Sequence, residues 1–150
     1  MHVEVDQSGK ISDTKVPTVL AFSDGENYAI LIPASVKREC IKFLRNRYRA
    51  LRQPYMKLFA GALFLLLESS LPKITAMTLD AEYPGHEPEI RGMLLENVRH
   101  LQPDFAKERI IFRRIGKKSP AHKKAYAVFK GKDKPDRIIS FRQMQSVLSK

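Results

Sequence analysis

Cysteine is nearly absent from this chain, and the patterns of a secreted or membrane protein are missing as well. The one cysteine, Cys40, has no partner for an intramolecular disulfide and cannot build a cysteine-based zinc site. The N-terminal residues lack the basic and apolar regions of a signal peptide. The longest apolar stretch, Leu58 to Leu67, is shorter than the roughly 20 residues of a spanning helix. We therefore expect a cytoplasmic protein that makes no membrane contact.

Acidic residues are few compared with basic ones. The chain has 150 residues with 27 Lys and Arg against 16 Asp and Glu, which gives a formal net charge of +11. A surplus of this size favours a polyanionic partner, and we expect nucleic acid, either RNA or DNA. With 43% hydrophobic residues and only 7 Gly and 9 Pro, the composition excludes low-complexity disorder. The length predicts a single domain over residues 1–150.

The first third of the chain has the pattern of an antiparallel meander. Apolar residues alternate with polar ones from His2 to Asp6, and two apolar runs at 18–22 and 28–32 flank the turn signal Asp24-Gly25. Two further strands are predicted, one at 74–79 that ends at Asp80 and one at 109–113. Helices are predicted at 35–52, 55–70, 87–101, 119–129 and from Ser140 onward. We therefore predict an α/β fold with a mixed five-stranded sheet flanked by helices.

The predicted helix at 35–52 is strongly basic. We treat it as a basic insertion at about 34–53, opened by Ser35 as a capping residue. A run of charges is often only a solvated face, but here arginines spread over several faces, which favours binding of a phosphate backbone. The residues that we expect to bind nucleic acid on it are Lys37, Arg38, Arg45, Arg47, Arg49 and Arg52.

Acidic residues and a histidine lie where strands end or a helix begins. Asp6 closes the first predicted strand, Asp80 closes the fourth with Glu82 beyond it, and His122 lies in the first turn of the helix after Ser119. If the first and fourth strands are neighbours, these side chains converge at one edge of the sheet. Carboxylates at close quarters repel unless a divalent cation lies among them, and an oxygen-rich set suits Mg²⁺ or Mn²⁺. Such ions can activate water for attack on a phosphodiester.

This order of elements and residues resembles the ribonuclease H-like superfamily, which includes ribonucleases H, Holliday-junction resolvases and the Piwi domains of Argonautes. The resemblance covers about residues 3–129, and its motifs are Asp6–Gly9, Leu79–Glu82 and Gly116–His122. In members that use an Asp-Asp-His set, these residues bind the catalytic metals. The resemblance therefore implies Asp6, Asp80 and His122 as catalytic residues and metal ligands, with Glu82 as a fourth ligand.

Two features depart from the family pattern. Ribonucleases H carry a glutamate in the first turn of the helix before the fourth strand, whereas that turn here, residues 55–58, has no carboxylate and Glu68 lies at the other end of the helix. The basic helix is also extra to the minimal fold. Both departures favour a divergent or inactive relative over a nuclease for RNA–DNA hybrids.

Each candidate residue also has an ordinary structural interpretation. Asp6 before Ser-Gly is a common turn opener, Asp80 can cap a loop, and Glu82 and His122 can be surface groups. The turn that contains Lys117 and Lys118 precedes a helix start, where free N–H groups favour phosphate. We therefore expect a nucleic-acid-binding protein that acts as a metal-dependent nuclease, or alternatively a non-catalytic nucleic-acid-binding or assembly protein of the same fold.

Overall fold

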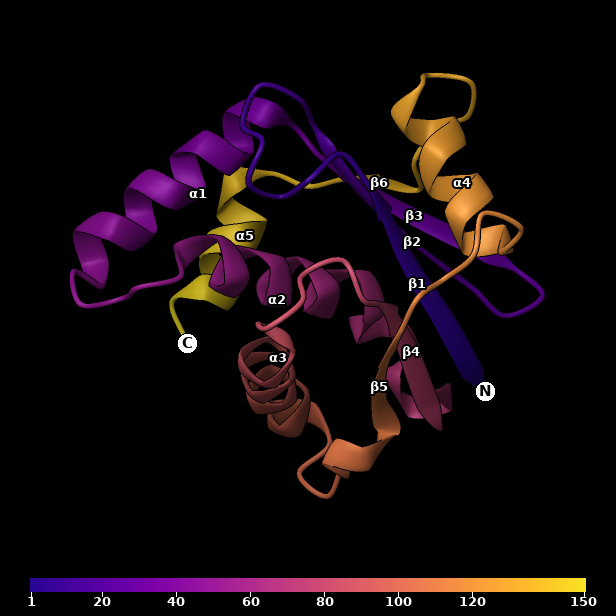
Figure 1. Ribbon diagram of the computed structural model, residues 1–150. Helices are drawn as coiled ribbons and strands as arrows, with labels where there is room; N and C mark the ends of the chain where they lie inside the picture. The colour runs from indigo at the N-terminus through magenta and orange to yellow at the C-terminus, as the bar shows by residue number, and fades with distance from the viewer.

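A six-stranded mixed sheet runs through the molecule, with helices on both of its faces (Figure 1). The computed structural model describes residues 1–150. The strand order is β5-β4-β1-β2-β3-β6. The strands are β1 (His2–Ser8), β2 (Thr18–Ser23), β3 (Asn27–Ile32), β4 (Ala76–Asp80), β5 (Ile110–Arg113) and β6 (Arg137–Ile138). The helices are α1 (Ala34–Arg47), α2 (Pro54–Leu67), α3 (Glu87–Leu101), α4 (Pro120–Phe129) and α5 (Phe141–Leu148), with 3-10 turns at Glu68–Lys73 and Lys107–Arg109.

The strand pairing confirms an α/β fold with an antiparallel meander. Strands β1, β2 and β3 pair antiparallel in sequence order. Strands β4 and β5 extend the sheet beyond β1 in parallel. The predicted number of five strands is wrong, because β6 pairs in parallel with the free edge of β3 through Arg137 and Ile138. A strand of two residues is too short to produce an alternating pattern in the sequence.

The two faces of the sheet are covered differently. Along β2, Leu20 and Phe22 belong to the large core cluster that includes α2, whereas Val19 and Ala21 pack with residues of α4. This alternation follows from the period of two residues along a strand. Figure 1 shows α4 alone on one side of the sheet, with the other helices on the opposite side. The side chains on the α4 side that it packs against are small, so this helix lies close to the strands.

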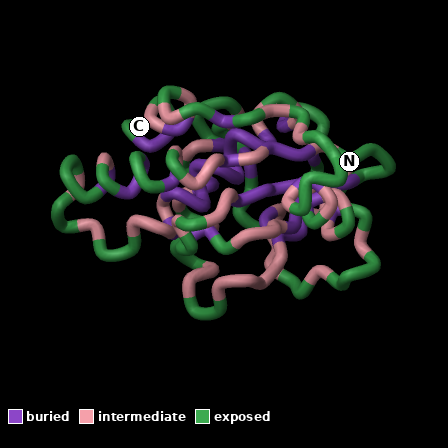
Figure 2. Tube along the Cα trace, turned by 90° about the horizontal axis from the view of Figure 1, so that it is seen from above, coloured by how far each residue is buried: buried purple, intermediate pink, exposed green.

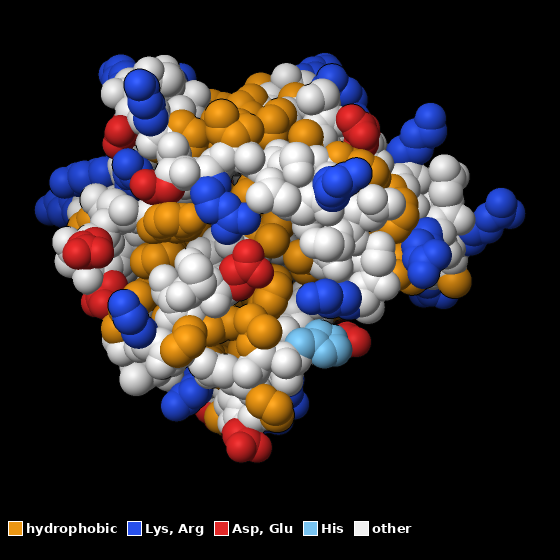
Figure 3. All heavy atoms as spheres, turned by 180° about the vertical axis from the view of Figure 1, so that it is seen from behind, with side chains coloured by type: hydrophobic (Ala, Val, Ile, Leu, Met, Phe, Trp, Pro, Cys, Tyr) orange, Lys and Arg blue, Asp and Glu red, His pale blue; other side chains and the backbone are white.

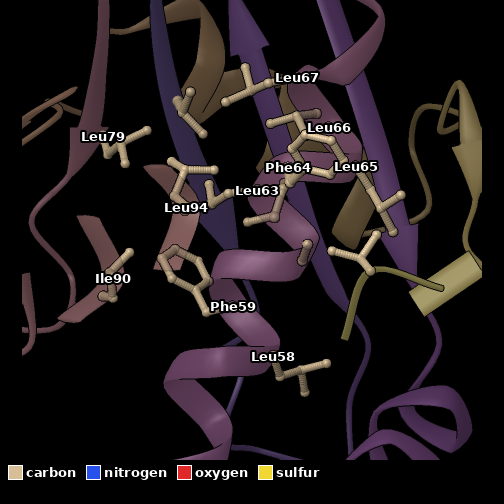
Figure 4. Packing of buried hydrophobic residues seen from close by; sticks show 14 of the residues in the cluster. Leu58, Phe59, Leu63, Phe64, Leu65, Leu66, Leu67, Leu79, Ile90 and Leu94 are labelled. Atoms are coloured by element: carbon tan, nitrogen blue, oxygen red, sulfur yellow. The ribbon is translucent and has the colours of Figure 1, made fainter. Parts of the chain in front are cut away.

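Helix α2 forms the centre of the large core. Eleven of its residues are buried, and Figure 4 shows its leucines and phenylalanines packed with Leu79 of β4 and with Ile90 and Leu94 of α3. The continuous helical stretch Pro54–Lys73 has the length and composition of a membrane span, but 67% of its most apolar window is buried inside the protein. Figure 2 shows the same distribution, with buried residues along the middle of the molecule and exposed ones on its outer loops. This burial agrees with the prediction of a core helix.

Helix boundaries differ from the predicted ones at the basic insertion. Helix α1 begins at Ala34 and has Pro33 at its N-cap, so the predicted cap by Ser35 is wrong. The helix ends at Arg47 rather than near residue 52, and its C-cap Tyr48 has non-helical backbone angles, with φ −123° and ψ 72°. Arg49 and Arg52 therefore lie in the segment that leads to Pro54.

The predicted caps near the C-terminus are confirmed. The Ser119 side chain accepts a hydrogen bond from the Ala121 N–H at the start of α4. Ser140 and Gln143 form a capping box at the start of α5. Both caps satisfy backbone groups that would otherwise lack partners at the helix N-terminus, and they fix where each helix begins.

Candidate functional site

Asp6 lies on β1 and faces α4 from beneath. Asp6 is buried, with 5% of its surface exposed. The carboxylate accepts hydrogen bonds from the Gln7 backbone N–H at 2.7 Å and from His122 Nδ1 at 2.8 Å. Burial raises the pKa of Asp6, the two hydrogen bonds partly offset that rise, and the nearby charge of Asp80 adds to it. Asp6 is thus a buried carboxylate with a second acidic group close by.

Asp80 lies at the C-terminal end of β4, the strand beside β1. The parallel register pairs Val5 with Leu79, so the next positions on the two strands are Asp6 and Asp80. Neighbouring residues of paired strands point to the same face, which places both carboxylates on the α4 side. One Asp80 oxygen accepts the Ile115 N–H at 2.8 Å, which ties the loop after β5 to this edge. The predicted condition for convergence, that the first and fourth strands are neighbours, is therefore met.

Glu82 follows β4 rather than extending it, but it stays near the other two carboxylates. Burial raises its pKa, the charges of Asp80 and Asp6 raise it further, and Lys10 lowers it. Three carboxylates that influence one another in this way form an acidic cluster, which we define as Asp6, Asp80 and Glu82. Lys10, in the loop after β1, is a cation that lies close enough to affect it.

His122 lies in the first turn of α4, in contact with Asp6 of the acidic cluster. Its Nδ1 is engaged by Asp6, so only Nε2 remains for another partner. The imidazole side chain is 31% exposed, and its ring stacks on Tyr126 at 6.4 Å between centroids. The structure thus brings Asp6 and His122 into direct contact although 116 positions separate them in the chain.

Two supporting contacts were missed at the sequence level. Glu4, one alternation before Asp6 on the same face, accepts a hydrogen bond from Ser119 Oγ at 2.9 Å and so holds the start of α4 against β1. The period of two along β1 was a usable signal for Glu4. Tyr83 donates to Gln7 Oε1 at 3.0 Å and accepts the Ile11 N–H at 3.1 Å. No local pattern predicts that second link, because it joins a loop to residues 72 and 76 positions away.

The donor set can be tested against a divalent cation. No group of three or more His, Cys, Asp or Glu side chains stands close enough to form a complete ligand set. Mg²⁺, however, is usually held by one or two carboxylates and completes its shell with water and substrate phosphate oxygens. Asp6 and Asp80 on adjacent strands match that smaller requirement, and their oxygen chemistry suits Mg²⁺ or Mn²⁺. The four-ligand set of Asp6, Asp80, Glu82 and His122 is not assembled in this structure.

One residue of the expected nucleic-acid surface is misplaced. Lys37 is fully buried, and its ammonium group donates to the carbonyl oxygens of Lys10 and Asp13 and to Thr18 Oγ1. Burial lowers the pKa of Lys37 to about 8, with the charge of Asp13 acting in the opposite direction. Lys37 therefore clamps the loop between β1 and β2, and its assignment to a phosphate-binding surface is wrong.

The other basic candidates are at the surface. The exposed residues are Arg38, Arg45, Arg47, Arg49, Arg52, Lys117 and Lys118. Figure 3 shows basic side chains projecting from the right-hand edge of that view, where α1 lies, and from the opposite edge, where α4 lies. The basic groups therefore occupy two separate regions, with Lys117 and Lys118 just before the helix that carries His122.

Comparison with known proteins finds no match for this chain, whether among protein-family models, curated proteins or solved structures. Function must therefore be argued from the side chains at the acidic cluster and from the charge around it.

Proposed function

We propose that this protein is a divalent-metal-dependent nuclease with a ribonuclease H-like architecture. The observation that carries the proposal is that Asp6 of β1 and Asp80 of β4 follow neighbouring paired positions, while His122 of α4 is hydrogen-bonded to Asp6. The order of elements supports the proposal, because the meander, the parallel fourth strand and the late helix follow one another in the order that the resemblance implies. The net charge of +11 suits a nucleic-acid substrate.

The chain's own residues have separate roles in this proposal. Asp6 and Asp80 would hold Mg²⁺ or Mn²⁺, and in such sites the ion activates water and stabilises the leaving oxygen. The Gln7 N–H and His122 fix the orientation of the Asp6 carboxylate, and the Ile115 N–H fixes that of Asp80. His122 Nε2 is the ring nitrogen that is left for a further partner.

The nucleic-acid backbone would be attracted from beside these carboxylates. Lys117 and Lys118 are exposed in the turn before α4, five and four residues before His122 in the chain. Two cations placed there offset the repulsion between a phosphate and the acidic cluster. The proposed cellular location is the cytoplasm, because Cys40 is a free, buried thiol and the cytoplasm keeps thiols reduced.

A non-catalytic nucleic-acid-binding protein is the second candidate, and two observations favour it. The first turn of α2 has no carboxylate, and no three ligand-type side chains are gathered for a metal. In that case Asp6 and Asp80 would hold α4 and the loop after β5 in place, through the hydrogen bonds already described.

The substitution Asp80→Asn separates the two candidates. For a nuclease we expect Mg²⁺- or Mn²⁺-dependent cleavage to fall by more than about 100-fold, beyond the loss typical when only a supporting residue is removed. Binding of nucleic acid, measured in EDTA, should stay equal or become tighter because a negative charge is lost. Asp24→Asn, at the exposed turn between β2 and β3, is the matched control and should leave both unchanged.

The assay should offer single-stranded, duplex, hybrid and branched substrates to the unmodified protein. Cleavage of any of them that depends on added metal and disappears in Asp80→Asn supports the nuclease. Binding without cleavage of all four would overturn it in favour of the non-catalytic protein.

A further inference from the structure

A basic groove lies away from the acidic cluster, between α1 and the start of α2. It has a volume of about 330 Å³ and is lined by Thr14, Arg38, Ile41, Lys42, Arg45, Asn46 and Tyr55. No acidic side chain lines it. Three cations, two polar side chains and one aromatic ring thus surround a space whose volume is at the lower end of the range found for ligand pockets.

The three cations form one stripe along α1. Arg38, Lys42 and Arg45 follow one another at intervals of four and three residues, which places them on the same face of the helix. Like charges at these intervals repel one another, and none of the ion pairs in the structure includes any of the three. The stripe therefore presents uncompensated positive charge to whatever occupies the groove.

Hydrogen bonds hold the wall of the groove opposite α1. Arg38 donates to the Thr14 carbonyl oxygen at 2.7 Å, and the buried Lys37 ammonium binds the carbonyl groups of Lys10 and Asp13. Figure 1 shows this loop between β1 and β2 beside the N-terminal end of α1. The groove is thus a preformed feature of the fold.

The same loop connects the groove to the acidic cluster. Lys10 is close enough to Glu82 to lower its pKa, and Thr14, four residues on, lines the groove. Four residues of extended chain span at most about 14 Å. The groove therefore lies at the same end of the sheet as the acidic cluster, on the α1 and α2 side, whereas the cluster is on the α4 side.

We propose that this groove binds the backbone of a single-stranded nucleic acid, with Tyr55 in contact with a base, at the same end of the sheet as the proposed nuclease site. This inference rests on the proposed function for the path of the nucleic acid toward the acidic cluster. Binding of the nucleic acid in the groove does not depend on it. From Arg38 to Arg45 the helix rises about 10 Å, which matches about three nucleotides of a stacked strand. A space of this size accepts a single strand, whose bases stack on aromatic rings, rather than the full width of a duplex.

The test is fluorescence anisotropy with a labelled single-stranded oligonucleotide of mixed sequence and with its duplex, both in EDTA. The double variant Lys42→Glu with Arg45→Glu should bind the single strand at least about tenfold more weakly, with a salt dependence reduced by about 1.4 in slope. The control is Lys132→Glu with Lys134→Glu, an equal change of charge in the exposed loop after α4. It should lose less than about threefold and keep its slope.

Tyr55 gives an independent readout. Tyr55→Leu keeps apolar packing but removes the aromatic face, and should weaken single-strand binding about fivefold, while Tyr55→Phe should not. Circular dichroism and thermal unfolding of each variant show whether it has folded. A folded Tyr55→Leu that binds normally would overturn the base contact.

The outcomes also separate this inference from the proposed function. Equal losses for the two double variants would overturn the groove, and equal losses for single strand and duplex would overturn the single-strand assignment. If the groove variants lose binding while the unmodified protein cleaves nothing, the groove stands and the nuclease alone fails.

Discussion

The buried ammonium of Lys37 should make the stability of this protein depend on pH in an unusual range. Its three hydrogen bonds satisfy all of its N–H donors, but burial still disfavours the charged form and lowers its pKa from 10.5 to about 8. Because the unfolded chain then binds more protons than the folded one between pH 8 and 10.5, the free energy of unfolding rises with pH in that window.

The size of the effect follows from the shift. One pKa unit corresponds to about 1.4 kcal/mol, so keeping Lys37 charged in the folded state costs about 3 kcal/mol below pH 8. Between pH 7 and pH 10 the folded protein should recover about 2 kcal/mol of that cost. The cost is present at neutral pH and is relieved as the pH rises through the two pKa values.

The measurement is urea unfolding from pH 7 to pH 10, followed by far-UV circular dichroism because the chain has no tryptophan. The quantity to compare is the difference in unfolding free energy between the unmodified protein and Lys37→Met, since other titrating groups cancel in it. This difference should shift by about 2 kcal/mol in favour of the unmodified protein. Lys42→Met, an exposed position on the same helix, should give a flat difference. A flat difference for Lys37→Met as well would refute the reasoning.

Two further predictions concern the site and the turn beside it. His122→Ala removes the partner of Asp6 and should lower the Mn²⁺ affinity measured by calorimetry about 10- to 100-fold, while His122→Asp should retain part of that affinity. If both variants bind Mn²⁺ like the unmodified protein, His122 has no role in metal binding. Gly9→Ala should destabilise the protein by at least about 1 kcal/mol in thermal unfolding, because φ is +82° and a methyl group would collide with the Pro17 carbonyl oxygen; an unchanged melting temperature would contradict that strain.

Local patterns were sufficient for most of the secondary structure. The alternation in the first third and the Asp24-Gly25 turn predict the hairpin, and β2 and β3 pair there from Thr18 with Ile32 to Ser23 with Asn27. The capping signals at Ser119 and Ser140 also placed two helix starts. These features depend on neighbouring residues, so a sequence contains enough information to predict them.

Long-range packing set the features that could not be predicted. Lys37 lies in a run of basic residues, and nothing local shows that a loop 19 to 27 positions earlier in the chain closes over it. Strand β6 forms where Arg137 and Ile138 pair with the free edge of β3, and two residues are too few to indicate a strand on their own. Tertiary contacts override local preference at both places.

The candidate site could be predicted only on the condition that two particular strands are neighbours. Asp6, Asp80 and His122 could be selected by position, but their convergence required that the first and fourth strands be neighbours, which pairing of residues 74 positions apart decides. Whether they act on a metal stays a prediction. The position of Glu4 on the same face follows from the alternation along β1, whereas the link from Tyr83 to Gln7 emerges only when the elements are placed in space.

The isolation of α4 on its face of the sheet has a consequence for when the site comes into being during synthesis. His122 and the rest of α4 leave the ribosome more than a hundred residues after Asp6. The large core on the opposite face draws on β1 to β4 and α2, and all of these elements precede α4 in the chain. A nascent chain can therefore gather much of its core while the Asp6 carboxylate still lacks its imidazole partner and its cover. The site is then completed only after α4 has been synthesised, later than much of the core.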